Sequence, residues 1–251
     1  MMVLHRDEQK IEHARFVDLR KFLREGDLLV LNDSRVLSAR HFSDNGKLEF
    51  LFLEKLAARR WKALVKPGRR FGRGAVASIQ GVQAEGGQIF ADGSHEIILA
   101  EDIDLLHGGA MPLPPYIKRP ALTSISLGTG SDRPSIKEDE ARYQTVFAKY
   151  DGSLAAPTAG LHFTPALEAA LRQRGVEINR LTLHVGAGTF LPVKVEDTAE
   201  HRMHAEWGTV SAETARKLNE ARAKGGRIVA IGTTSLRLLE SAAHERCDCD
   251  R

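Results

Sequence analysis

The sequence predicts an α/β fold with a mostly parallel sheet, interrupted by an inserted small β-barrel domain. Helix-like and strand-like segments alternate before residue 43 and again after residue 106, which is typical of a parallel sheet covered by helices. Between these positions, short runs of alternating apolar and polar residues are separated by glycines, as in small all-β modules. We therefore expect a discontinuous α/β catalytic domain of residues 1–42 and 107–251, and an inserted β-barrel domain of residues 43–106.

The N-terminal part predicts one helix and one buried strand. Apolar residues three or four positions apart, from Phe16 to Leu23, predict a helix that ends at Gly26. The apolar run at 28–31 predicts a buried strand, and the polar residues 32–35 follow at its carboxyl end. Ligands of open α/β sheets bind at this end of the strands. These polar residues are therefore candidates for a binding site.

The central region predicts strands only. Alternating runs are found at 47–53, 61–65, 75–79, 88–91 and 96–99. A proline-stiffened linker at 111–116 leads out of this module, and the Ser-, Thr-, Gly- and Pro-rich segment 121–137 predicts a surface loop.

The C-terminal part returns to alternating helices and strands. Helices are expected at 165–174, 212–223 and 236–243, and strands at 176–183 and 227–231. Thr164 is placed to cap the first of these helices, and Gly175 to end it.

Two further junctions between a strand and a helix carry small or polar residues. The segment 157–162 allows a ligand to approach the backbone closely, and His162 ends it, although a lone histidine is more often structural. The segment 232–235 opens a helix, where free N–H groups favour a carboxylate or another anion. The same Thr and Ser residues also fit a simple helix cap.

The segment 182–207 holds the greatest density of titratable groups. It combines His184, His201 and His204 with a glycine turn at Gly186 and Gly188. Three imidazoles could bind a metal ion, but no Cys or carboxylate motif of a known metal type accompanies them. We therefore expect a site without a metal.

Composition limits the classes of protein that remain. The formal net charge of +3 is too small to predict nucleic-acid binding by itself. No apolar run could span a membrane, and the charged N-terminus does not resemble a signal peptide. Cys247 and Cys249 are the only cysteines, which excludes a disulfide framework. We expect a cytoplasmic monomer without membrane attachment.

Seven segments resemble, in matching order, the S-adenosylmethionine:tRNA ribosyltransferase-isomerase family of the queuosine pathway. They are LNDSRVLSAR (31–40), MPLPPYIKR (111–119), RYQTVFA (142–148), AAPTAGLHFT (155–164), LTLHVGAGTF (181–190), EHRMHAEW (200–207) and AIGTTSLRLLES (230–241). Because these motifs cover most of the chain, the resemblance is highly specific.

The resemblance implies a fold, a reaction and two partners. The family has an α/β domain with an inserted β-barrel, which agrees with the boundaries given above. Its members transfer and isomerise the ribosyl part of S-adenosylmethionine onto 7-aminomethyl-7-deazaguanine at the tRNA wobble position. The product is epoxyqueuosine-tRNA, and adenine and methionine are released. S-adenosylmethionine is consumed as the ribosyl donor, so no separate cofactor is expected.

That reaction suggests roles for particular residues. A base must remove a weakly acidic proton next to the sulfonium, for which Asp33, His184 and His204 are candidates. Planar guanidinium groups suit the methionine carboxylate or tRNA phosphates, and aromatic rings suit stacking on a base. The substrate-binding candidates are Asn32, Arg35, Tyr116, Thr158, Gly160, His162, Phe163, Gly186, Gly188, Thr189, Arg202, Thr233, Thr234 and Arg237.

The chain also departs from the family pattern. Family members continue well past Ser241 and begin with a further N-terminal element, so we expect this chain to lack both segments. One alternative is therefore a truncated, non-catalytic paralogue that binds tRNA or S-adenosylmethionine. Another is a metal hydrolase that uses the three histidines.

Overall fold

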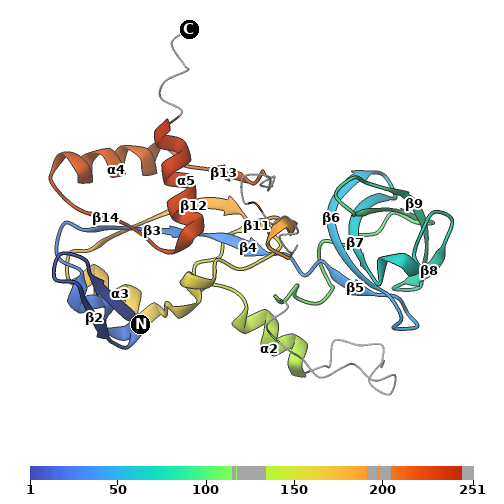
Figure 1. The fold of residues 1–251 in the computed structure, drawn as a ribbon, viewed down its shortest axis with the longest axis horizontal. Coiled ribbons are helices and arrows are strands. Elements are labelled where there is room, and N and C mark those ends of the chain that lie inside the picture. The colour runs from blue at the N-terminus through green and yellow to red at the C-terminus, as the bar shows by residue number, and fades with distance from the viewer. Residues whose placement is uncertain (115–116, 118–133, 191–196, 198–204, 245–251) are drawn as a thin grey trace, which may run out of the picture.

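The computed structural model describes residues 1–114, 117, 134–190, 197 and 205–244, and it has two lobes (Figure 1). One lobe holds a mixed four-stranded sheet with helices on its faces. The other is a curled, six-stranded antiparallel sheet. Two further pairs of strands lie outside these sheets. Within the described ranges, no helix is both long and apolar enough to cross a membrane.

The six-stranded sheet has the order β5-β6-β7-β10-β9-β8, and every pair of neighbours is antiparallel. Its strands are β5 (Arg40–Phe42), β6 (Glu49–Ala57), β7 (Arg60–Lys66), β8 (Val76–Ile79), β9 (Val82–Ile89) and β10 (His95–Leu99). The sheet begins at Arg40, before the predicted boundary at residue 43. The division into two independent domains stays a prediction.

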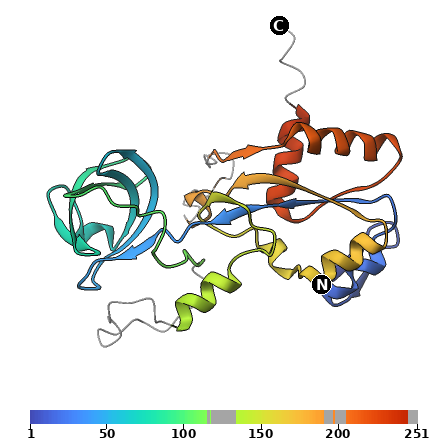
Figure 2. The same cartoon turned by 180° about the vertical axis from the view of Figure 1, so that it is seen from behind.

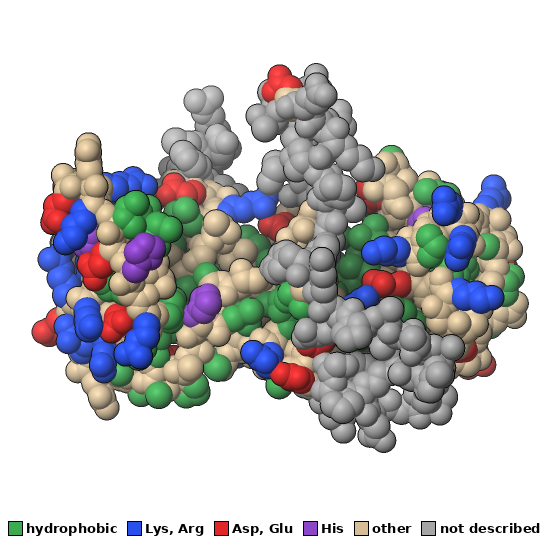
Figure 3. Space-filling model, turned by 60° about the horizontal axis from the view of Figure 1, so that its bottom comes forward, with side chains coloured by type: hydrophobic (Ala, Val, Ile, Leu, Met, Phe, Trp, Pro, Cys, Tyr) green, Lys and Arg blue, Asp and Glu red, His purple; other side chains and the backbone are tan. Residues whose placement is uncertain are grey.

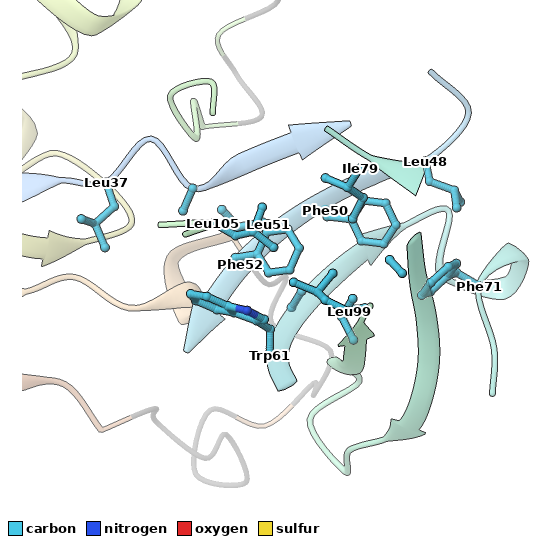
Figure 4. Packing of buried hydrophobic residues seen from close by; sticks show 14 of the residues in the cluster. Leu37, Leu48, Phe50, Leu51, Phe52, Trp61, Phe71, Ile79, Leu99 and Leu105 are labelled. Carbon is cyan, nitrogen blue, oxygen red and sulfur yellow. The ribbon is translucent and has the colours of Figure 1, made fainter. Parts of the chain in front are cut away.

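Aromatic side chains fill the inside of this curled sheet (Figure 4). Trp61 is buried, and its ring meets that of Phe52 edge-on at 5.8 Å. Phe50 contacts Phe71 in the same way at 5.2 Å. Such edge-to-face pairs are favoured by the ring quadrupole and add to the gain from burying apolar surface. This lobe therefore has a core of its own.

The four-stranded sheet has the order β13-β12-β3-β14. Its strands are β3 (Leu28–Asn32), β12 (Glu177–His184), β13 (Trp207–Thr209) and β14 (Ile228–Ala230). β3 pairs in parallel with β12 and β14, whereas β13 runs antiparallel to β12. The α/β prediction holds in its coarse form. The prediction of a mostly parallel sheet is not confirmed, because β13 and the whole six-stranded sheet are antiparallel.

Helices cover both faces of β3, which is buried along its whole length. Leu29 and Leu31 pack on one face with Leu167 and Leu171 of α3 (Pro165–Gln173). On the other face, Leu28 and Val30 pack with Leu218 of α4 (Ala212–Ala223) and with Leu238 of α5 (Gly232–His244). Successive side chains of a strand point to opposite faces, so a continuous apolar run is what a strand between two layers requires.

Local signals placed several helix ends correctly. Thr164 caps α3 by accepting a hydrogen bond from the Leu167 N–H at 3.2 Å, and Gly175 has a positive φ of 75°. The predicted helix at 16–23 is shorter, formed by a 3-10 turn at Phe16–Asp18 and by α1 (Leu19–Phe22). The predicted loop at 121–137 is wrong from residue 134 onward, because α2 (Pro134–Arg142) begins there.

Two strand pairs complete the described fold. β1 (Met2–His5) and β2 (Lys10–His13) form an N-terminal hairpin. β4 (Ser34–Val36) runs parallel to β11 (Tyr150–Ser153), directly after β3. The carboxyl ends of β3 and β12 point toward the six-stranded lobe in both views (Figures 1 and 2). Residues that follow these strands are therefore on the side of the α/β lobe that faces the other lobe.

A charge pair closes the opposite end of the sheet. The Asp27 carboxylate is buried and accepts hydrogen bonds from the Arg227 guanidinium and, at 2.8 Å, from the Arg24 backbone N–H. Arg227 also donates to the Phe22 carbonyl at 2.9 Å. The hydrogen bonds from Arg227 hold the pKa of Asp27 below its ordinary value. A buried carboxylate depends on such donors.

We expect Arg227→Ala to lower the free energy of unfolding by about 1.5–3 kcal/mol, because Asp27 would stay buried with fewer donors. Urea unfolding at pH 7 measures this change. Arg216→Ala is the matched control, since Arg216 pairs with Glu220 on an exposed helix face and should cost about 0.3–0.5 kcal/mol. Equal losses in the two variants would contradict a structural role for the Asp27 pair.

Candidate active site

Asn32 joins β3 to β12 beyond the last backbone pair of the two strands. Its side-chain amide donates to the Leu183 carbonyl at 2.9 Å, and its carbonyl accepts from the Leu183 N–H at 3.0 Å. The same oxygen accepts from the Ser34 N–H at 3.2 Å. Asn32 is buried and offers little surface to a substrate, so its structural use is to hold the strand ends together.

Asp33 comes next and is also buried. The Thr182 hydroxyl donates to its carboxylate at 2.7 Å. Burial raises the pKa of Asp33, while the Thr182 hydrogen bond and the charges of Arg180 and Lys149 oppose that rise. A carboxyl group that burial shifts toward its neutral form is a candidate for proton transfer.

His184, the last residue of β12, lies between a glycine and an indole ring. Its ring stacks on that of Trp207, with the centroids 5.3 Å apart and the planes 12° from parallel. On the other side, a Cβ built on Gly152 would lie 2.6 Å from Nδ1 of His184. Gly152 also has a φ of 145°, which other residues rarely adopt. Both reasons require glycine at this position.

The electrostatics of His184 favour the neutral imidazole. Burial lowers its pKa, while the negative charges of Asp33 and Asp151 oppose that effect. Nδ1 is buried, and in the described part of the chain it has no hydrogen-bond partner. A neutral ring with an unused nitrogen has the chemistry of a proton acceptor or donor.

Two serines link the strands around His184. The Ser34 and Ser153 hydroxyls are 2.7 Å apart, and Ser153 accepts from the Val185 N–H at 2.9 Å. Ser153 therefore ties β11 to the residue after His184. Nothing local to Ser153, Gly152, Thr182 or Trp207 signals the neighbours that the fold gives them, so the sequence did not predict them as site residues.

The glycine turn after His184 is held by a carboxylate. Glu206 accepts a hydrogen bond from the Gly186 N–H at 3.0 Å and another from the Arg237 guanidinium of α5. Glu206, which belongs to the titratable segment 182–207 but was not among the predicted binding residues, thus connects the turn to α5. Gly188 and Thr189 follow within a 3-10 helix at Ala187–Phe190.

A pocket of about 410 Å³ lies beside the second predicted junction. Thr158 and His162, from the 3-10 helix at Thr158–His162, line it together with Gly232 at the start of α5. Gly160 is buried, and a Cβ there would lie 2.8 Å from the Thr145 side chain. Gly160 therefore serves close packing and not ligand approach.

Phe163 requires a correction. The expected stacking of its ring on a base is wrong, because Phe163 is only 2% exposed. It packs in the core against Phe16 at 5.3 Å and Phe147 at 6.1 Å. Its apolar ring gains more from this core than from a surface position, because the core removes it from water.

The remaining predicted residues occupy different environments. Arg35 is half-exposed, donates to the Ala148 carbonyl at 2.9 Å and lies 3.4 Å from the Asp151 carboxylate. At the start of α5, Thr233 is exposed and Thr234 is half-buried. Tyr116, Arg202 and His204 lie outside the described residues, as does His201.

The fold brings the predicted residues into three groups, each following the carboxyl end of a parallel strand. Asp33 and His184 form one group, and Gly186 and Arg237 form another through Glu206. Thr158, His162 and Gly232 line the pocket, which neither Asp33 nor His184 lines. Across the described ranges, no three His, Cys, Asp or Glu side chains gather to hold a metal ion. Because His201 and His204 lie outside these ranges, the absence of a metal stays a prediction.

Comparisons with known proteins agree with each other. The sequence model of the family described as "Queuosine biosynthesis protein" matches residues 1–250. An S-adenosylmethionine:tRNA ribosyltransferase-isomerase of Bradyrhizobium diazoefficiens is 50% identical over 251 residues, covering 91% of this chain and 64% of that protein. Its namesake in Rhodopseudomonas palustris (strain BisB5) is 47% identical, covering 97% of this chain and 70% of that protein.

A solved structure is also similar in sequence. The S-adenosylmethionine tRNA ribosyltransferase of Thermotoga maritima is 32% identical, and the match covers 97% of this chain and 64% of that one, with a TM-score of 0.40. The chain therefore spans 64% to 70% of the length of these relatives.

We expect Gly152→Ala to lower the free energy of unfolding by about 1–3 kcal/mol more than a control glycine substitution does, because the new Cβ would collide with the His184 ring. The control is Gly93→Ala, which has a positive φ of 83° but no atom within 4 Å of its Cβ position. Thermal or urea unfolding measures both variants. A Gly152→Ala variant as stable as Gly93→Ala would show that His184 does not occupy this position.

Proposed function

The chain belongs to the queuosine biosynthesis protein family, and on this premise we propose that it is a ribosyltransferase-isomerase acting on tRNA. It transfers and isomerises the ribosyl moiety of S-adenosylmethionine onto 7-aminomethyl-7-deazaguanine at the wobble position. Epoxyqueuosine-tRNA, adenine and methionine are the products. S-adenosylmethionine is a consumed donor in this proposal, so the reaction needs no separate cofactor.

The placement of Asp33 and His184 at the carboxyl ends of the neighbouring strands β3 and β12 is the observation that carries this proposal. The reaction needs a base to remove a weakly acidic proton from the carbon next to the sulfonium. Burial lowers the pKa of His184, so its imidazole is neutral and able to accept a proton near pH 7. The charge of Asp33 raises the pKa of His184 and stabilises the imidazolium that forms.

Asp33 is the second candidate for a proton-transfer role. Burial raises its pKa while it lowers that of His184, so the two values move toward each other. An acid or base works best when its pKa lies near the operating pH, and burial moves the pKa of Asp33 in that direction. The hydrogen bond from Thr182 orients the Asp33 carboxylate.

Substrate binding is assigned to residues other than Asp33 and His184. The pocket of about 410 Å³ beside Thr158 and His162 has a size that suits part of a small ligand such as the donor. Arg35 and Arg237 suit the methionine carboxylate or phosphates, with Asp151 and Glu206 as their partners within the protein. Thr233 and Thr234, at the start of the 13-residue helix α5, suit a carboxylate.

The proposed macromolecular partner is a tRNA that carries the aminomethyl base. Lys and Arg side chains are present on both lobes of the face shown in Figure 3, interspersed with Asp and Glu. Cations spread in this way suit contacts with phosphates along an RNA strand, which position the RNA without reading its sequence. A monomeric state, a cytoplasmic location and the absence of a membrane contact stay predictions.

The alternative named in the sequence analysis is a protein that binds tRNA or S-adenosylmethionine without turning the donor over. The two functions differ in one product, since only the enzyme releases adenine.

We expect the protein to release adenine when it is incubated with S-adenosylmethionine and tRNA carrying 7-aminomethyl-7-deazaguanine. His184→Ala should slow single-turnover release by roughly 10²- to 10⁴-fold, the usual contribution of a general acid or base. His5→Ala, which removes a histidine from the N-terminal hairpin, should leave the rate unchanged. Retarded tRNA on a gel with no adenine release would instead support the binding-only function.

A proton titration tests the electrostatics of the pair without turnover. NMR should give His184 a pKa below the ordinary value of about 6.5, and Asp33→Asn should lower it further, because the carboxylate that favours the imidazolium is gone. Asp104→Asn is the control. It should lower the pKa of His107, which Asp104 raises, and leave His184 unchanged. A pKa of His184 that rises in Asp33→Asn would contradict the proposed coupling.

A further inference from the structure

Trp207 is an unusually exposed tryptophan. It is the first residue of β13, which is an edge strand of the four-stranded sheet, and its side chain is 64% exposed. The other tryptophan, Trp61, is 2% exposed and sits in the core of the six-stranded lobe. Leaving a large apolar ring in water forgoes the gain that its burial would give, and this ring lies against His184 of the candidate site.

One face of the indole is already occupied. Trp207 lies opposite His184 in the antiparallel register of β12 and β13, and the two rings are nearly parallel at 12°. Side chains directly opposite each other in such a pair share one face of the sheet. The ring of His184 therefore fixes the orientation of the indole and covers one of its faces. Because Trp207 as a whole is 64% exposed, much of the indole surface that His184 does not cover is open to solvent.

We propose that the open face of Trp207 is a stacking platform for an unpaired base of the RNA substrate. This inference rests on the proposed function for the presence of RNA. Aromatic side chains hold single-stranded bases by stacking, which tolerates any sequence because every base has a flat π-face. Trp207 thus has the stacking role that was expected of Phe163, which is buried in the core.

The openness of the site favours a base of the RNA over the adenine of the donor. Small-molecule sites usually bury most of their ligand's surface, whereas Trp207 lies on an exposed sheet edge and does not line the 410 Å³ pocket. A base that belongs to a larger bound molecule does not need such enclosure, because contacts elsewhere on the RNA hold it in place.

The geometry also indicates which base it is. A base stacked on the open face of Trp207 has the indole between itself and His184. The thickness of one ring therefore separates this base from the imidazole. In the proposed reaction the donor carbon next to the sulfonium approaches the imidazole, and the reacting base must reach that donor. We therefore assign the platform to a base next to the reacting one, whose stacking would fix the position of the RNA strand.

Intrinsic fluorescence tests this proposal, because Trp207 is the exposed member of a pair of tryptophans. Titration with an anticodon stem-loop RNA should quench the solvent-exposed part of the emission, and a fully paired RNA duplex should not. Trp207→Ala should weaken stem-loop binding roughly 5- to 100-fold, the range that base–aromatic stacking gives. Trp207→Phe keeps an aromatic face and should retain most of the affinity.

Filter binding measures the affinities of variants that lack the fluorophore. Phe90→Ala is the matched control, since it removes a partly buried aromatic ring from the six-stranded lobe and should leave the affinity unchanged. Thermal melting checks that each variant is folded. If Trp207→Ala lowers the melting temperature strongly, the comparison between Trp207→Phe and Trp207→Leu takes its place, because both fill the position and only one can stack.

Two results would overturn the proposal. One is stem-loop binding by Trp207→Ala, or by Trp207→Leu, that equals the wild-type affinity. The other is quenching of Trp207 by S-adenosylmethionine alone, which would assign the platform to adenine. Because binding needs no turnover, the proposed reaction is judged separately. If the protein releases no adenine but Trp207→Ala weakens RNA binding, the proposed reaction is contradicted and the stacking platform is supported.

Discussion

The candidate site depends on the bridge that Asn32 makes between β3 and β12. Its amide continues the pairing of the two strands past their last backbone bond by engaging both polar groups of Leu183. This bridge sets Asp33 beside Thr182 and places His184 one residue beyond the contact. Buried polar groups that lose such partners cost about 1–3 kcal/mol each, so the bridge tolerates little change in side-chain chemistry.

Burial decides the chemistry of the two groups that follow this bridge. Asp33 and His184 are both shifted toward their neutral forms by desolvation, and each is also shifted in the opposite direction by a neighbour. The imidazole keeps its place because Gly152 has no side chain on one side and Trp207 supplies a flat ring on the other. A general acid or base needs a fixed position as much as a suitable pKa, and the fold supplies both here.

The two lobes share part of one hydrophobic cluster. Leu37 and Leu154, from the segments that follow β4 and β11, belong to the same buried cluster as the aromatic core of the six-stranded sheet. Figure 4 shows Leu37 at the side of this cluster that faces the α/β lobe. The carboxyl ends of β3 and β12 point toward the same region (Figures 1 and 2). The candidate site therefore lies where a large substrate could contact both lobes.

The sequence alone determined the elements whose signals are local. The apolar run at 28–31 predicted β3, and Thr164 and Gly175 marked the ends of α3. Glycine-punctuated alternation predicted four strands of the six-stranded sheet, but it missed β5, and β9 begins six residues before the run predicted at 88–91. The sequence also identified Asp33 and His184 as candidates, because their motifs carry a family resemblance. The match of the family model to residues 1–250 confirms that resemblance.

Only the tertiary structure decided the surroundings of these residues. The antiparallel pairing of β13, the stacking of Trp207 on His184 and the space left by Gly152 all join segments that are distant in the chain. The burial of Phe163 in the core and the exposure of Trp207 at the surface were likewise decided by tertiary packing. Whether an aromatic ring is buried depends on what packs against it, and a sequence pattern describes a residue's neighbours along the chain rather than in space.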